Sequence, residues 1–272
     1  MGILPMVNNN INNNININIS LPDIVNQKRV GTLFQPIVSV ENGVVCGYEA
    51  LARGPEGSLL YEANDLFAKA ENQGYLSRLD QLTSQLAVIR FKQRELVEQL
   101  FLNFSPHSLV SNRQVMSDLL AFMQLQDMQP EQVVIEITEH CPIEDIGKLC
   151  SVLDRYRKAG FKIALDDLGS AYSSLQLWSE LKPEYVKLDR HFIQQIHLHE
   201  EKQYFVQSMQ ELAEKLGCIV IAEGIENRRE LETICKMGIP LVQGFYICKP
   251  LEQPVTHPAS LATMGFMQAQ TA

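Results

Sequence analysis

Acidic and amide side chains stand at or near the ends of several short apolar runs in this chain. Four of these runs read FLNFS, VVIEITE, IALDDLGS and VIAEGIE, and a fifth reads GYEAL. Buried carboxylates are costly unless a cation gathers them. We therefore expect the polar side chains of these runs to meet around a positive charge. They are Glu49, Asn103, Glu136, Asp166, Asp167 and Glu223.

The donor types of this set indicate which cation would bind. All of the candidate ligands are oxygen donors, and no histidine lies at these strand ends. Such a set favours Mg²⁺ or Mn²⁺ over Zn²⁺. The adjacent pair Asp166–Asp167 offers a bridging carboxylate, which suits two metal ions about 3.5–4 Å apart.

Two metal ions held by carboxylates are suited to displacement at a phosphodiester. Lys187, in the run YVKLD, would orient the attacking water or stabilise the developing charge. Glu223 would serve as a metal ligand or as a general base. Arg53 follows Glu49 by four residues and would hold a phosphate or a guanine edge.

Each residue also has a purely structural interpretation. An Asp-Asp pair after a strand often forms a turn or caps a helix, and Asn103 before Ser105 is also typical of a turn. Glu226 would complement the dipole of a following helix. The combination favours the metal site, because acids or amides at five strand ends have few structural explanations.

The elements that must position these residues alternate between strands and helices. Eight strands alternating with helices favour a (β/α)8 barrel of the TIM type over an open doubly wound sheet. The open sheet would normally bring a glycine-rich phosphate turn after its first strand, and none occurs. The predicted strands cover residues 32–39, 44–51, 100–104, 132–138, 162–167, 184–188, 218–223 and 240–246.

Local signals refine this barrel. Asn42-Gly43 between two apolar runs predicts a type I′ turn, so the first two strands should be antiparallel and the barrel irregular. Asn64 or Asp65 is the predicted cap of the next helix. A later helix is predicted to end at Gly217. Its predicted apolar face consists of Phe205, Met209, Leu212 and Leu216.

Composition excludes several classes of protein. The 272 residues carry a net charge of −9 without a basic cluster, so direct binding to nucleic acid is not expected. There is no apolar stretch of 18 residues and no signal peptide with a basic start, so we expect no membrane insertion. The six cysteines form no CxxC pair, which is typical of reduced thiols in a cytoplasmic protein.

Low complexity marks one end of the chain. Residues 8–19 read NNNINNNININI, and we interpret residues 1–22 as a disordered Asn-rich leader. Residues 23–256 form the predicted catalytic domain, with regular structure beginning near residues 23–29, and residues 257–272 form a C-terminal tail.

The motifs of this domain, taken together, closely resemble those of the EAL domain family. The resemblance extends from about Thr32 to Leu251. The motifs are QPIV (35–38), EALAR (49–53), NFSP (103–106), EITE (136–139), DDLGSAYSSL (166–175), VKLDR (186–190), AEGIE (222–226) and QGFYICKPL (243–251).

The resemblance implies a fold, an activity and a set of roles. EAL domains are irregular (β/α)8 barrels with an antiparallel first strand, and they hydrolyse cyclic di-GMP to linear pGpG with two Mg²⁺ or Mn²⁺ ions. Lys187 would contact the nucleophilic water, and Glu226 and Gln243 match further positions required for activity. Gln35, Arg53 and Asp189 would contact the substrate. The implied metal ligands are Glu49, Asn103, Glu136, Asp166, Asp167 and Glu223.

One loop departs from the usual motif of the family, DDFGTGYSSL. The departures are Leu168, Ser170 and Ala171, and Glu139 matches the acid that anchors this loop. The loop is associated in the family with dimerisation, so a homodimer is expected. The departures leave open a receptor or protein-interaction module that binds cyclic di-GMP without cleaving it. A different metal-dependent barrel enzyme, such as a glycerophosphodiesterase, is a third hypothesis. An upstream sensor or protein partner would supply regulation.

Overall fold

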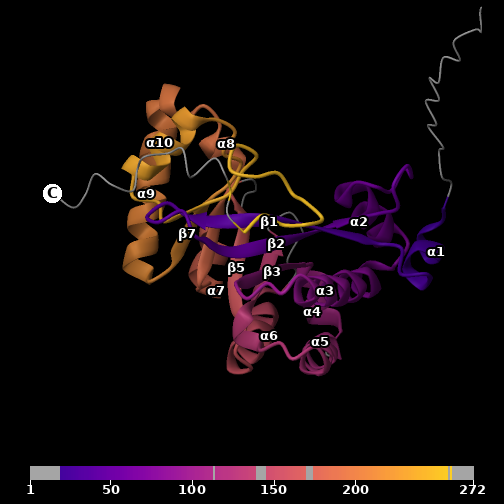
Figure 1. Ribbon diagram of the computed structural model, residues 1–272. Helices are drawn as coiled ribbons and strands as arrows, with labels where there is room; N and C mark the ends of the chain where they lie inside the picture. Colours follow the sequence, from indigo (N-terminus) through magenta and orange to yellow (C-terminus); the bar gives the residue numbers. More distant parts are fainter. Residues whose placement is uncertain (1–18, 113, 139–144, 170–173, 257, 259–272) are drawn as a thin grey trace, which may run out of the picture.

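A closed barrel of eight strands forms the centre of the computed structural model, which describes residues 19–112, 114–138, 145–169, 174–256 and 258 (Figure 1). Neighbouring strands in the barrel are also neighbours in sequence, which confirms the predicted (β/α)8 architecture. The strands are β1 (Gly31–Ser39), β2 (Val45–Arg53), β3 (Gln99–Phe104), β4 (Val133–Thr138), β5 (Lys162–Leu168), β6 (Tyr185–Leu188), β7 (Ile219–Ala222) and β8 (Leu241–Val242).

One strand of the barrel is reversed. β1 pairs antiparallel with both β2 and β8, whereas every other neighbouring pair is parallel. The predicted antiparallel first strand is therefore confirmed. The carboxyl ends of β2 to β8 consequently share one mouth of the barrel with the amino-terminal half of β1.

The turn between β1 and β2 differs from the predicted type I′ turn. A type I′ turn needs positive φ at both central residues. Gly43 has φ of 68°, but Asn42 is not among the residues with positive φ. The amide of Gly43 instead donates to Ser39 O, and the side chain of Asn42 accepts from the amide of Val44. The connection is therefore longer than a two-residue turn, although it reverses the chain as predicted.

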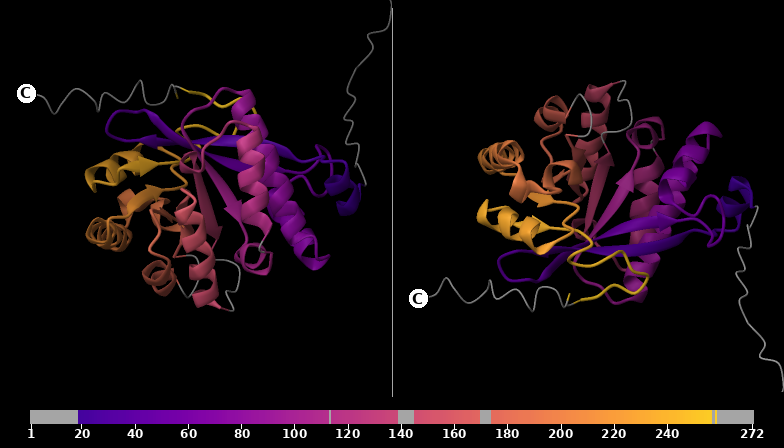
Figure 2. Two further views of the ribbon diagram at one scale, coloured as in Figure 1. Left: turned by 90° about the horizontal axis from the view of Figure 1, so that it is seen from below. Right: turned by 90° about the horizontal axis from the view of Figure 1, so that it is seen from above.

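Helices lie outside the barrel against its strands, as the two further views show (Figure 2). No helix in the described part of the chain is long and apolar enough to cross a membrane. The helices are α1 (Leu21–Asn26), α2 (Ala63–Asn72), α3 (Leu76–Gln93), α4 (Pro106–Ser111), α5 (Gln114–Leu125), α6 (Ile146–Lys158), α7 (Ser174–Leu181), α8 (Arg190–Ile193), α9 (Glu200–Leu216) and α10 (Arg228–Lys236).

Several local predictions meet different outcomes in these helices. Gly217 ends α9 with φ of 69°, as predicted. The predicted cap of α2 is wrong, because that helix already begins at Ala63 after Glu62. The predicted apolar face of α9 is partly wrong, because Phe205 is 58% exposed while Val206 is buried. α1 begins at residue 21, inside the range assigned to the leader.

The interior of the barrel holds a layer of apolar side chains below its mouth. These side chains form a cluster separate from the larger core between the strands and the helices. Each strand except β2 contributes one residue to the layer, because alternate residues of a strand face the same side. The contributing residues are Ile37, Phe101, Val134, Ala164, Tyr185, Ile221 and Leu241.

The loop after β2 depends on a close backbone approach at Gly54. The amide of Gly54 donates to Tyr61 O at 2.8 Å, which closes the loop that leads to α2. A Cβ atom at residue 54 would lie 1.9 Å from Leu60 O, and this neighbour is backbone. Only glycine therefore fits the loop as it is folded.

We predict that Gly54→Ala lowers the free energy of unfolding by about 1–3 kcal/mol, since the added methyl group must push backbone aside. Urea denaturation followed by circular dichroism measures the change. Gly147→Ala is the matched control, because Gly147 lies within α6 with no atom closer than 3.5 Å to an added Cβ. Alanine favours helix there, so equal losses in the two variants would contradict the prediction.

Candidate active site

A second, polar layer lies two residues beyond the apolar layer, at the mouth of the barrel. The two-residue step keeps these side chains on the inner face of each strand. On the reversed strand β1 the same layer is reached two residues earlier in the chain, at Gln35. On β2, Gly47 is the inward residue beside Phe101, and Glu49 lies two residues beyond it. The layer consists of Gln35, Glu49, Asn103, Glu136, Asp166, Lys187, Glu223 and Gln243.

Lys187 occupies the centre of this layer. Its side chain is 1% exposed, and four carboxylates surround its ammonium group. The ammonium nitrogen lies 3.2 Å from Glu49, 2.9 Å from Glu136, 3.0 Å from Asp166 and 2.7 Å from Glu223. One buried cation thus draws side chains from β2, β4, β5 and the end of β7 together.

A bulge in β5 brings Asp166 and Asp167 to the same site. Consecutive residues of a regular strand point to opposite faces. The pairing of β5 with β6 shifts register between Leu165 and Leu168, and Asp167 has φ of 55°. The backbone is therefore no longer regular at the pair, and both carboxylates reach Glu223. The amide of Asp167 also donates to the Asp166 carboxylate at 3.0 Å.

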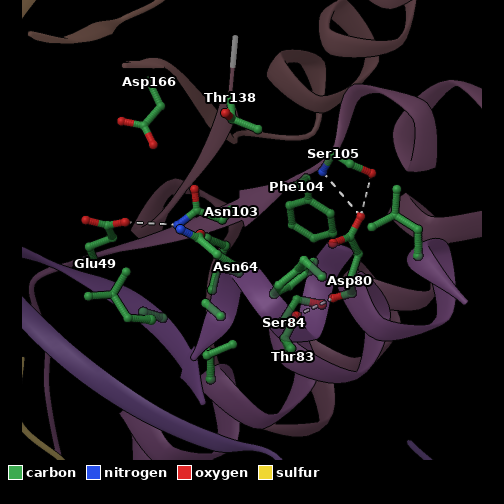
Figure 3. A pocket seen from close by; sticks show the side chains of 18 of the residues that line it. Glu49, Asn64, Asp80, Thr83, Ser84, Asn103, Phe104, Ser105, Thr138 and Asp166 are labelled. Atoms are coloured by element: carbon green, nitrogen blue, oxygen red, sulfur yellow. Dashed lines mark hydrogen bonds between the residues drawn. The ribbon is translucent and has the colours of Figure 1, made fainter. Parts of the chain in front are cut away.

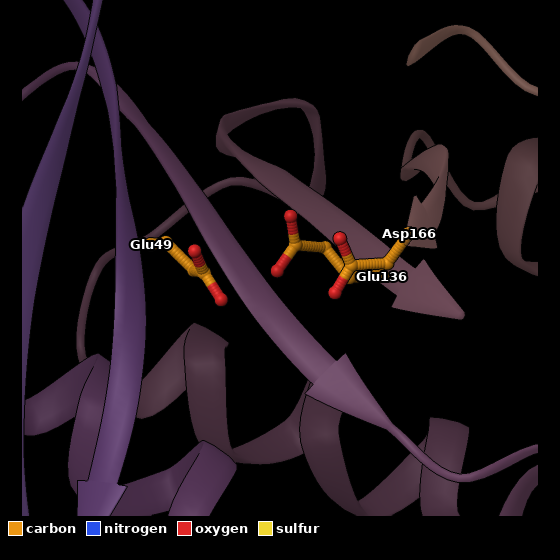
Figure 4. A group of neighbouring side chains, drawn as sticks. All are labelled: Glu49, Glu136 and Asp166. Atoms are coloured by element: carbon orange, nitrogen blue, oxygen red, sulfur yellow. The ribbon is translucent and has the colours of Figure 1, made fainter. Parts of the chain in front are cut away.

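Two groups of three carboxylates have the spacing of a metal site. One group contains Glu49, Glu136 and Asp166, and Figure 4 shows their side chains converging. The other contains Asp166, Asp167 and Glu223. Within each group the chosen oxygens lie within 4.8 Å of one another. Asp166 belongs to both groups, as the sequence predicts for a bridging ligand.

Glu136 supplies an independent sign that the site accommodates a cation. This carboxylate is fully buried. Its Oε1 lies 2.9 Å from Lys187 without hydrogen-bond geometry, and Oε2 has no hydrogen-bond partner among the described residues. A buried carboxylate oxygen normally has a partner. The oxygen-donor set and this unpaired atom both fit a hard divalent cation such as Mg²⁺ or Mn²⁺.

Two amide side chains fix the position of Glu49. Asn103 donates to one oxygen of Glu49 at 3.0 Å, and Gln243 donates to the other at 2.7 Å. Gln243 also lies 3.2 Å from Gln35 Oε1, and Gln35 in turn donates to Cys248 O. Asn103, Glu49, Gln243 and Gln35 therefore form one hydrogen-bonded chain.

These contacts separate the pKa values of the carboxylates. Burial works to raise the pKa of Glu49, but Lys187, Gln243 and Asn103 together bring it below its usual value. Burial raises the pKa of Glu136, Asp166 and Glu223, and neighbouring carboxylates raise it further. The positive charge of Lys187 lowers it, but not enough to cancel the rise. The four carboxylates outweigh burial and hold the pKa of Lys187 well above its ordinary value.

The rim of the site contains the remaining predicted residues. Asp189 accepts from the amide of His191 and caps α8, and Glu226 forms an ion pair of 3.0 Å with Arg190. Arg53 is the last residue of β2, two residues beyond the cavity-lining Leu51, and its side chain lies 3.7 Å from that of Glu62. Glu139, Ser170 and Ala171 lie outside the described residues.

Two cavities flank the carboxylates and share Glu49, Leu51 and Asp167. The larger, of about 590 Å³, extends beside α2 and α3 and reaches Asp80 (Figure 3). The smaller, of about 210 Å³, lies over β8 and the loops after β6 and β7. Gln35, Asp189 and Glu226 line the smaller cavity, whereas Arg53 lines neither.

Sequence reasoning did not identify two buried acids near the site. Asp80 on α3 accepts hydrogen bonds from Ser105, and Glu230 on α10 accepts from the amides of Glu226, Asn227 and Gln195. Asp80 stands inside a helical pattern beside an apolar residue, so nothing local distinguishes it from a solvated acid. Asn227 at the start of α10 and Glu230 three residues later do match a capping box, which is a readable signal.

We predict that Lys187→Met lowers the free energy of unfolding by about 3 kcal/mol or more, because four carboxylates, three of them buried, lose their counter-ion. For the same reason Mn²⁺ should raise the melting temperature of the variant more than that of the wild type. Thermal unfolding with and without Mn²⁺ measures both effects. Lys158→Met, at an exposed lysine of α6, is the control, and a Lys187 variant that behaves like it would contradict the prediction.

We predict that Asp80 makes stability depend on pH, because burial raises its pKa to about 6, against hydrogen bonds from Ser108 and Ser105. The folded state holds this proton more tightly than the unfolded state, so stability is lost as pH rises from about 4 to about 6. Asp80→Asn removes the loss. Its advantage over the wild type should grow by about 3 kcal/mol across that range and then stay constant. Urea titrations at several pH values test this, and an advantage independent of pH would contradict it.

The chain matches the family model of the EAL domain over residues 19–250. Among curated proteins, the probable cyclic di-GMP phosphodiesterase PdeG of Escherichia coli is 29% identical over 234 residues, which cover 84% of this chain and 46% of PdeG. The cyclic di-GMP phosphodiesterase RocR of Pseudomonas aeruginosa is 29% identical over 81% of this chain and 57% of RocR. The chain thus spans about half the length of the curated relatives it matches.

Solved structures show the same fold. BlrP1 of Klebsiella pneumoniae, in complex with calcium and cyclic di-GMP, aligns with a TM-score of 0.78 and 31% identity over 85% of this chain and 58% of BlrP1. A standalone EAL protein of Vibrio cholerae bound to cyclic di-GMP aligns with a TM-score of 0.77 and 28% identity, over 86% of this chain and 97% of that protein. The match of the family model across nearly the whole described chain shows that this protein belongs to the EAL domain family.

Proposed function

We propose that this chain is a metal-dependent phosphodiesterase that hydrolyses cyclic di-GMP to linear pGpG. The observation that carries the proposal is the pair of carboxylate groups that share Asp166 around Lys187. The two groups contain five carboxylates, and Lys187 contributes one ammonium, so five negative charges against one positive charge leave −4 if all are ionised. Two divalent cations would balance this charge, which supports a two-metal site.

The ligand roles follow from the two groups. Glu49, Glu136 and Asp166, with Asn103 beside them, would hold one cation, and Asp166, Asp167 and Glu223 would hold the other. Mg²⁺ or Mn²⁺, when bound, stabilises charge on the phosphate oxygens and lowers the pKa of water. The related BlrP1 forms complexes with calcium or manganese together with cyclic di-GMP, which supports both the metal and the substrate.

The chain's own residues then act on water and phosphate. Lys187 directs its ammonium group into the carboxylate layer, where it would orient the attacking water and stabilise the developing negative charge. Glu223, whose carboxylate lies 2.7 Å from the Lys187 ammonium, would take up the proton that the water releases. The water oxygen forms a bond to phosphorus, one ring P–O bond breaks, and the released ribose oxygen takes a proton, which opens the cyclic dinucleotide.

The two cavities support a ligand with two bases. They lie on either side of Glu49 and Asp167, so a phosphodiester held at the carboxylates would extend one nucleoside into each. Gln35, Gln243, Asp189 and Glu226 would contact the nucleotide on the side of the smaller cavity. We also propose that residues 23–256 form the catalytic domain and that Arg53 contacts the substrate from the end of β2. The homodimer and the upstream sensor stay predictions.

We predict that the purified chain converts cyclic di-GMP to pGpG with Mg²⁺ or Mn²⁺, and that Glu49→Gln lowers the rate by at least about 100-fold, since it removes one charged ligand. Separation of the nucleotides by chromatography measures the product. Glu41→Gln, at an exposed acid of the β1–β2 turn, is the matched control and should keep the wild-type rate.

Two outcomes would count against this proposal in different ways. Binding of cyclic di-GMP by the wild type without pGpG under either metal would replace the enzyme by a receptor. Equal rates for the Glu49 and Glu41 variants would mean that the carboxylate layer is not the site of hydrolysis.

A further inference from the structure

Asp80 is a buried carboxylate that lies outside the carboxylate layer. It projects from α3 and is 1% exposed. It accepts two hydrogen bonds from Ser105, one from the amide at 3.2 Å and one from the hydroxyl at 2.8 Å (Figure 3). A buried ionisable group is costly to a fold, so its placement against this one turn calls for a reason.

Capping of α4 does not require Asp80. Ser105 is the N-cap of α4, and its own hydroxyl accepts from the amide of Ser108 at 3.2 Å. The two serine hydroxyls also lie 2.8 Å apart, and Ser108 is fully buried. The helix therefore has its cap within residues 105–108. Asp80 instead connects this turn to α3 through its hydrogen bonds with Ser105.

The turn that Asp80 holds begins at the end of β3, next to a metal ligand of the proposed site. Asn103 precedes Ser105 by two residues, and its side-chain amide donates to Glu49 at 3.0 Å. Asn103 is also paired with Glu136 in the register of β3 and β4. A displacement of residue 105 would therefore move Asn103 relative to both Glu49 and Glu136.

We propose that Asp80 is a positioning residue, which holds the turn after β3 through Ser105 so that the Asn103 side chain is aligned with Glu49 for a divalent cation. This inference rests on the proposed metal site. Groups outside the ligand shell that orient the ligands commonly change metal affinity about 10- to 100-fold. Asp80 lies on α3, in the wall of the larger cavity, and would not contact the cation itself.

Mn²⁺ binding to the substrate-free protein, measured by calorimetry, tests the proposal independently of hydrolysis. Asp80→Leu keeps the branched shape, with methyl groups in place of the oxygens, but removes the acceptors, and we expect the dissociation constant to rise about 10- to 100-fold. Asp80→Asn keeps an acceptor oxygen and should bind within about twofold of the wild type. Ser105→Ala removes the hydroxyl contact with Asp80 together with the side-chain cap of α4, but it keeps the contact from the Ser105 amide. It should give an intermediate loss and serves as well if Asp80→Leu does not fold.

A matched control separates positioning from general loss of stability. Glu184 also accepts from a strand amide, that of Ile163 at 2.8 Å, but it lies before β6 at the opposite end of the barrel. Glu184→Leu should lower the melting temperature and leave Mn²⁺ binding unchanged. In an Asn103→Ala background, Asp80→Leu should weaken Mn²⁺ binding no further, because the positioned side chain is already absent.

The outcomes distinguish this inference from the proposed function. Mn²⁺ binding by Asp80→Leu and Ser105→Ala at the wild-type affinity would overturn the positioning role alone. An equal loss in Asp80→Leu with and without Asn103 would also overturn it, since the effect would not pass through Asn103. A wild-type protein that binds no Mn²⁺ would overturn the metal site and this inference together.

Discussion

The mouth of the barrel depends on one buried ammonium group among four carboxylates. Like charges within a few ångströms raise each other's pKa, so these carboxylates would not gather in a buried layer unaided. Lys187 lies within 3.2 Å of each of them and supplies the opposing charge. Because its partners come from four separate strands, the same contact fixes how those strands meet at the mouth. A single charge cannot neutralise the whole set, and the surplus of negative charge is the physical basis for a cation site.

The barrel geometry converts this electrostatic constraint into a layered interior. Apolar side chains such as Phe101 and Tyr185 fill the layer below. Their rings pack edge to face, with the ring centroids 5.4 Å apart. They keep water from reaching the carboxylates from beneath. The polar residues stand two positions further along each strand and so share the inner face. The reversed first strand follows the same rule in the opposite direction, which is why Gln35 precedes Ile37 and still joins the layer.

Helices outside the barrel also contribute carboxylates that hold its loops. Asp80 on α3 binds the turn after β3, and Glu230 on α10 binds backbone amides of the loops after β6 and β7. Neither group belongs to the carboxylate layer. Both accept hydrogen bonds from backbone amides, so they constrain the path of the chain directly. The loops at the mouth are therefore held by these carboxylates of the outer helices as well as by Lys187 inside the barrel.

The sequence alone determined the barrel, the reversed first strand and the polar residues of the layer, because these depend on local signals. Alternating apolar runs, a chain reversal at Asn42-Gly43 and polar ends of strands are all read within a few residues. Tertiary structure decided what depends on pairing across strands. The shift between β5 and β6 brings Asp166 and Asp167 to one site, although neighbouring strand residues should point apart. The central place of Lys187 and the contact of Asp80 with Ser105 join residues far apart in the chain, so only the closed fold could reveal them.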